Sequence, residues 1–123
     1  MSDVYSVVYS PEAMNDLREI YAYIAFDLQS PDAAEGQVNR LREEIRSLDF
    51  MPSRYAIVDW EPWMSMEMHR VPVHNFIVYY AVSNSSLTVT VIRIFYSGRD
   101  VENIINTERS HDHPLSGWLV LPL

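Results

Sequence analysis

The chain has 123 residues, of which 48% are hydrophobic and 12% are aromatic. This length and composition predict one folded domain with a sizeable core and exclude a largely disordered chain. There is no cysteine, which excludes a disulfide framework, thiolate chemistry and a cysteine metal site. We see neither a secretory signal nor an apolar stretch long enough to cross a bilayer, so we expect a cytoplasmic protein.

Charge is unevenly distributed along the sequence. Nine basic residues, all arginine, stand against seventeen acidic ones, for a net charge of −8. A strongly acidic chain argues against a protein that coats nucleic acid. Residues 64–99, however, hold three arginines and one acid, a local balance of +2. Two interpretations stay open: the acids form solvated helix faces, or the strand region keeps a small positive site on an acidic body.

The N-terminal half reads as a strand followed by two helices. Residues 4–9 are apolar and β-branched, which favours a strand. Ser10-Pro11-Glu12 is a helix start, and apolar residues at helical spacing continue to Leu28. Ser30-Pro31-Asp32 repeats the start signal, and Met51-Pro52 ends the second helix. Two amphipathic helices joined by a short connection predict an antiparallel αα-hairpin.

The second half reads as three strands and a short helix. The strands are predicted at residues 64–73, 76–82 and 87–97, and the helix at 101–105. The predicted fold class is therefore α+β, in the order β-α-α-β-β-β, with an antiparallel sheet packed on one face by the αα-hairpin. We expect a domain over residues 1–106 and a C-terminal tail over 107–123, either docked or flexible.

One sheet face has no predicted cover. Strand side chains alternate between faces, which puts Val89, Val91 and Phe95 on one side and Ile92, Ile94 and Tyr96 on the other. Both sides are apolar, and one αα-hairpin covers only one face. The tail, a second copy of the chain or a separate partner could cover the other. Methionine fills cores but also lines adaptable grooves. The candidate partner-binding residues are Met64, Met66, Met68, Ile92 and Ile94.

Polar residues at the ends of the strands form the candidate chemical site. Arg70, Arg93, Tyr96 and Arg99 are the best constellation, since arginine forks match phosphates and carboxylates. The alternative for these arginines is a structural ion pair, for example between Arg93 and a helix acid. His69 and His74 are candidate general acids or bases, or simply surface histidines.

The sequence contains no glycine-rich phosphate loop, nucleophile elbow or zinc motif. His111 and His113 flank Asp112 with a spacing compatible with metal binding. They lie on a polar segment without a second ligand cluster, so we interpret them as solvent-exposed residues that bind no metal. We therefore expect no metal and no cofactor.

Three segments together resemble a known family. They are YSVVYSPEAMNDLREIYAYIA near the start, HRVPVHNFIVYYAV in the middle and VIRIFYSGRDVENII near the end. They resemble the RelE/ParE family of bacterial toxins from type II toxin–antitoxin modules over about residues 4–106. The last segment is similar to the pattern Arg-Ile-x-(His or Tyr)-x-x-Arg-Asp of the ParE branch.

The resemblance implies a small α+β toxin that a cognate antitoxin wraps and neutralises. RelE-like members cleave messenger RNA on the ribosome with basic strand residues, whereas ParE-like members poison DNA gyrase. Ile77 occupies the position where RelE-like nucleases carry an arginine, and Ser97 is a second departure. The resemblance therefore favours a ParE-like inhibitor that acts by binding. The alternatives are a ribosome-dependent endoribonuclease and a non-toxic interaction module; a homodimer is also open.

Overall fold

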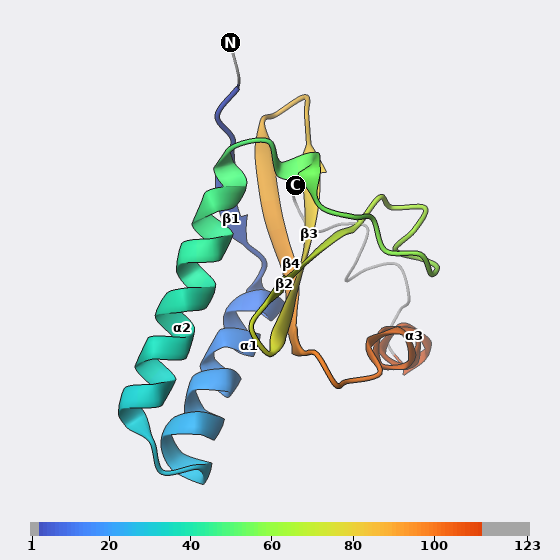
Figure 1. The fold of residues 1–123 in the computed structure, drawn as a ribbon. Helices are drawn as coiled ribbons and strands as arrows, with labels where there is room; N and C mark the ends of the chain where they lie inside the picture. Colours follow the sequence, from blue (N-terminus) through green and yellow to red (C-terminus); the bar gives the residue numbers. More distant parts are fainter. Residues whose placement is uncertain (1–2, 112–123) are drawn as a thin grey trace.

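The computed structural model describes residues 3–111, without the side chains of residues 109–111 (Figure 1). Residues 112–123, which include His113 and most of the predicted tail, lie outside the described residues. No helix among the described residues has the length and apolar character needed to cross a membrane. The elements are β1 (Ser6–Tyr9), α1 (Pro11–Ala22), α2 (Pro31–Arg46), β2 (His69–Val73), β3 (Phe76–Ser83), β4 (Thr88–Tyr96) and α3 (Val101–His111).

The strands form one four-stranded sheet in the order β1-β4-β3-β2. This architecture confirms the predicted α+β class, with the helix pair on one face and a short C-terminal helix. The sheet is not antiparallel throughout, because β1 pairs with β4 in parallel. The chain runs from β1 through the α1–α2 hairpin to β2, at the far edge of the sheet. It then returns through β3 to β4, which lies beside β1 and runs in the same direction. Helix α3 also continues past Ile105, where the sequence predicted its end.

The helix pair covers one face of the sheet and forms the main core with it (Figure 1). Ser10 caps α1 by accepting a hydrogen bond from the amide of Ala13 at 3.0 Å, and Pro11 occupies the first helical turn. A π-helical turn, Tyr23–Asp27, follows α1. Its wider winding shifts the phase of the side chains after it, and Leu28, which helical spacing assigned to the buried stripe, is 55% exposed.

A β-bulge in β4 changes which side chains face the helices. Tyr79 pairs with Arg93, but Tyr80 pairs with Val91, so Ile92 is an extra residue on β4. An extra residue reverses the alternation beyond it. Ile94 therefore packs into the core under the helix pair, while Ile92 packs on the opposite face. The prediction that placed Ile92 and Ile94 on one face is wrong for this reason.

The second face of the sheet is also covered, by the chain itself. Trp63 and Met68 from the segment before β2, with Val101 and Ile105 of α3, pack against it in a second buried cluster. Figure 1 shows α3 on the side of the sheet away from the hairpin. Residues 61–67 form turns instead of the strand predicted from Met64. These two segments were not among the three covers that the sequence analysis offered, namely the tail, a second copy of the chain or a separate partner.

Candidate functional site

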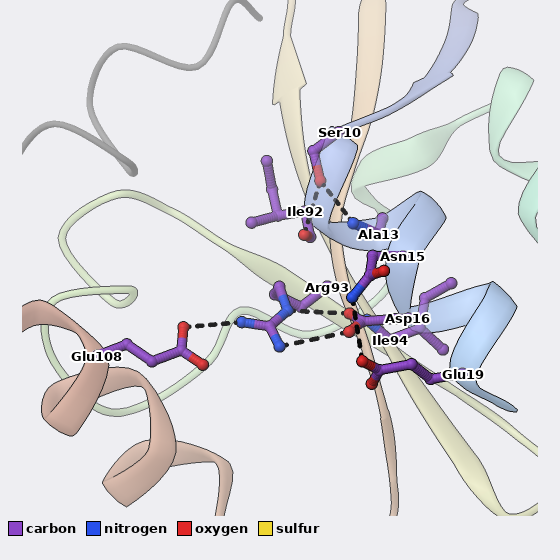
Figure 2. A network of polar contacts seen from close by, with 9 residues as sticks. All are labelled: Ser10, Ala13, Asn15, Asp16, Glu19, Ile92, Arg93, Ile94 and Glu108. Carbon is purple, nitrogen blue, oxygen red and sulfur yellow. Dashed lines mark hydrogen bonds and ion pairs between the residues drawn. The ribbon is translucent and has the colours of Figure 1, made fainter. Parts of the chain in front are cut away.

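Arg93 lies in a network that joins α1, β4 and α3. Its Nε donates to Asp16 Oδ2 at 2.9 Å, and its Nη2 donates to Asp16 Oδ1 at 3.3 Å. Its Nη1 donates to Glu108 Oε1 at 2.9 Å. Figure 2 shows the guanidinium between the two carboxylates, with Asp16 on α1 and Glu108 on α3. Arg93 thus links the helix layers on the two faces of the sheet.

β4 continues past the end of β1, which pairs with it only as far as Val91, and the start of α1 supplies the missing hydrogen-bond partners. Buried backbone groups without ladder partners must find others. The Ser10 amide donates to the carbonyl of Val91, and its Oγ donates to the carbonyl of Ile92, both at 2.8 Å. The amide of Ile94 donates to Asp16 Oδ2 at 2.9 Å. One cap residue and one acid of α1 therefore complete the hydrogen bonds of β4 at the bulge.

Arg93 and Asp16 form a largely desolvated ion pair. The side chains of Arg93 and Asp16 are only 11% and 7% exposed, whereas that of Glu108 is 42% exposed. Burial raises the pKa of Asp16 above the ordinary aspartate value, although hydrogen bonds from Arg93 and Ile94 oppose this change. Burial also opposes the charge on Arg93, but Asp16 and Glu108 outweigh it and raise the pKa of the guanidinium. Arg93 is therefore a permanent cation whose donors are directed at two carboxylates.

The end of β4 presents two further candidates, Tyr96 and Arg99. Tyr96 is 53% exposed and meets the ring of Phe76 edge-on, with centroids 5.7 Å apart. Arg99 is exposed, and its guanidinium carbon lies 5.8 Å from the ring centroid of Phe95. Arg93 lies over the same ring at 4.4 Å. Arg93, which is bound to carboxylates, and the exposed Arg99 therefore lie beside the same aromatic ring.

The remaining candidates lie on β2 and in the turn after it, and they do not converge. His69 is buried on the helix side, where its Nδ1 is 2.8 Å from the carbonyl of Tyr55 and its ring stacks on Tyr80. Arg70 is exposed, and strand alternation turns it to the opposite face. His74 is exposed in the turn after β2, at φ 55°. The two histidines therefore share no site with each other.

Three of the five predicted partner-binding residues are inaccessible. Met68, Ile92 and Ile94 are 1%, 3% and 2% exposed, respectively. Met66 is half-buried against the second cluster, and Met64 is 46% exposed. A surface made of all five would require the second face to open and Ile94 to leave the main core.

Two site residues, Asp16 and Glu108, were absent from the sequence predictions. Asp16 lies between Ala13 and Leu17 on the buried side of α1 and is itself 6% exposed. An acid inside an apolar stripe is a signal that a cationic partner exists. Glu108 gives no such signal, because it reaches Arg93 only through the packing of α3. Within residues 3–111, no cluster of three or more histidines and acids is arranged to hold a metal ion.

Comparison with known proteins connects this geometry to a family. The family model described as the ParE toxin of the type II toxin–antitoxin system parDE matches residues 7–101. The chain belongs to the ParE toxin family. The family predicted from the sequence is therefore confirmed, and the ParE match includes α1, the bulged β4 and Arg93. No curated protein matches the chain.

Solved structures share the fold of this ParE-family toxin at low sequence identity. A chain of the chromosomal ParDE system from P. aeruginosa is 20% identical, with a TM-score of 0.62, and the match covers 76% of this chain and 96% of that one. A chain of the RelBE2 toxin–antitoxin complex from Mycobacterium tuberculosis is 14% identical (TM-score 0.54; 76% and 92% covered). A chain of the RelE–RelB complex from Pyrococcus horikoshii is 16% identical (TM-score 0.53; 78% and 98% covered).

Proposed function

We propose that this ParE-family toxin inhibits its target by binding, that the target is a topoisomerase such as DNA gyrase, and that a cognate antitoxin neutralises it in the cytoplasm. Membership of the ParE family supports the choice of target class. The ParDE and RelBE systems that share its fold support an antitoxin as partner. The gyrase target and the antitoxin both follow from the resemblance and call for direct tests.

The engagement of Arg93 is the observation that favours binding over RNA cleavage. A ribonuclease needs cations and an acid or base that converge on one phosphate. Arg93 instead directs its Nε, Nη1 and Nη2 donors at Asp16 and Glu108. A phosphate would have to displace a buried carboxylate that also accepts the amide of Ile94. His69 is held at Tyr55 on the other face of the sheet, away from Arg70.

The exposed end of β4 is the surface we assign to the target. Tyr96 and Arg99 are both exposed there, and Arg99 lies beside the ring of Phe95. An exposed aromatic ring and an exposed arginine are the residue types most enriched at the energetic centres of protein interfaces. Arg70 is the second exposed arginine of this positively charged strand region.

The test distinguishes inhibition of gyrase from cleavage of messenger RNA. The purified protein is added to a gyrase supercoiling assay, and the same protein is expressed from an inducible promoter while DNA breaks and message integrity are followed. Inhibited supercoiling and a DNA-damage response with intact messages support the proposal. Codon-phased cleavage of messages on induction would replace it with the endoribonuclease alternative. Growth without a defect would favour the non-toxic interaction module.

A further inference from the structure

One part of the second sheet face stays exposed, along β1. The second buried cluster, which covers this face, includes residues of β3, β4 and α3 but, among the described residues, none of β1. Tyr5 and Val7 pack against the main core under the helix pair, so strand alternation turns Val4 and Val8 to the second face. Val4 is 69% exposed and Val8 is 43% exposed. The cover of the second face therefore ends before β1.

Phe50 widens this exposed surface. It forms an isolated antiparallel bridge with Val4, which places the two side chains on the same face, and it is 48% exposed. Ser6 lies between Val4 and Val8 on the same side of the chain. These four residues, Val4, Ser6, Val8 and Phe50, are called the β1 strip below. None of their side chains is charged, so the strip favours an apolar and uncharged occupant.

The C-terminal segment of the chain has the matching composition. Residues 114–123 carry no charged side chain, and Trp118 begins a run of four apolar residues. A tryptophan beside three aliphatic residues is unfavourable in water unless it packs against an apolar surface. The segment follows α3, whose last described residue is His111. An uncharged apolar segment thus comes directly after the helix that lies on the second face of the sheet.

The end of α3 lies within reach of the β1 strip. Glu108, three residues before the last described residue of α3, accepts a hydrogen bond from Arg93 on β4 (Figure 2). Val8 pairs with Thr90, three residues before Arg93, so Val8 and Arg93 are roughly 10 Å apart along the strands. Residues 112–123 can span about 40 Å when extended. The segment is therefore long enough to reach every residue of the strip.

We propose that residues 114–123 pack on the β1 strip and complete the cover of the second face, with the apolar run from Trp118 against Val4, Val8 and Phe50. The C-terminal segment is then part of the folded domain, and it keeps the apolar strip of one molecule from meeting that of another. This inference goes beyond the proposed function and does not depend on it.

Two arguments favour this occupant over others. A segment tethered by a short connection has an effective concentration of about a millimolar, which a second copy does not reach in a dilute solution. The other exposed apolar surface, formed by Tyr23, Phe26 and Leu28 at the end of α1, belongs to the helix pair on the opposite face of the sheet (Figure 1). The β1 strip lies on the same face as α3, and the helix pair does not.

Paramagnetic NMR tests the contact in the full chain. The chain contains no cysteine, so Ser116→Cys gives a single attachment site for a nitroxide. The nitroxide broadens the methyl signals of side chains close to residue 116, and the reduced nitroxide gives the reference intensity. The signals of Val4 and Val8 are compared with that of Leu28 on the far face. A second sample mixes spin-labelled protein with isotope-labelled wild type, so that it detects only contacts between molecules.

Two further substitutions in the spin-labelled protein complete the test. Val8→Asp introduces a charge into the strip and should release the apolar segment, because docking would then desolvate a carboxylate. The matched control, Leu28→Asp, makes the same change at an apolar side chain that is 55% exposed outside the strip. Circular dichroism verifies that both variants remain folded. If Val8→Asp unfolds the chain, Val8→Ser takes its place, because it removes apolar contact without adding a charge.

We expect Val4 and Val8 to lose most of their signal intensity in the spin-labelled protein, Leu28 to keep its intensity, and the mixed sample to show no broadening. Val8→Asp should restore the Val4 signal, and Leu28→Asp should leave it broadened. Unchanged Val4 and Val8 signals would overturn the proposal and leave the strip to a separate partner. Broadening centred on Leu28, or spread evenly over the surface, would also overturn it. Equal broadening in the mixed sample would assign the strip to the segment of a second copy instead.

Discussion

Replacing Asp16 with alanine tests whether the Arg93 network holds the fold together. The variant removes the acceptor of two hydrogen bonds from Arg93 and of one from the amide of Ile94. It leaves Arg93, whose side chain is 11% exposed, with Glu108 as its carboxylate partner. A desolvated cation and a buried amide thus lose their main acceptor in one step.

The magnitude follows from the burial of each partner. Removing one member of a buried ion pair costs about 3–5 kcal/mol, because the other charge stays buried without compensation. Glu108 is 42% exposed, so its pair with Arg93 is largely screened by water, and removing it should cost about 1 kcal/mol or less. A domain of this size has about 5–15 kcal/mol of stability in total. Asp16→Ala should therefore remove about a fifth or more of the free energy of unfolding, and Glu108→Ala little.

Urea denaturation followed by circular dichroism measures both variants, with Glu43→Ala as a control at an exposed acid of α2. A double-mutant cycle between Asp16→Ala and Arg93→Ala isolates the pair and should give a coupling energy above about 1.5 kcal/mol. If Asp16→Ala costs no more than Glu108→Ala, the pair does not stabilise the fold. Arg93 would then be available to a ligand, and the argument for binding over cleavage would lose its support.

Three further predictions concern single contacts. Ser10→Ala should cost about 1–2 kcal/mol in urea denaturation, because it removes both the cap of α1 and the donor to the Ile92 carbonyl; a loss equal to that of an exposed serine would contradict this. Tyr80→Phe should cost about 1–2 kcal/mol, since the buried hydroxyl donates to the Pro52 carbonyl at 2.6 Å; unchanged stability would mean that water replaces the contact. Arg99→Ala should keep the wild-type unfolding curve and weaken growth arrest on induction, and full toxicity of this variant would exclude Arg99 from the target surface.

The apolar periodicity and the helix start signals were sufficient to predict the helix pair, β1, β3 and the α+β class. These features are local: Ser10 and Pro11 start α1 through its own first turn, and spacing at three and four residues selects its buried face. Alternation failed in β4, because the extra residue at Ile92 is visible only in the pairing with β3. The sequence of β4 reads as a regular strand with or without a bulge.

Among the candidate site residues, the sequence identified Arg93 as unusual but left its partner open. A charged residue in a central apolar strand requires a partner, and that much follows from desolvation alone. Which partner it has depends on how α1 and α3 pack on the two faces of the sheet. That packing brings Asp16 and Glu108, seventy-seven and fifteen residues away along the chain, to Arg93. Arg70, Tyr96 and Arg99 remain exposed candidates, and Arg99→Ala tests the last of them.

Sequence alone determined the family and most of the secondary structure, since both depend on residue type and short-range spacing. Tertiary structure decided which surfaces are free. The segment before β2 and helix α3 cover the face that seemed bare, whereas Val4 and Val8 stay exposed on the same face. For a face or an edge of the sheet, whether a side chain is buried or available depends on long-range packing, which no local pattern encodes.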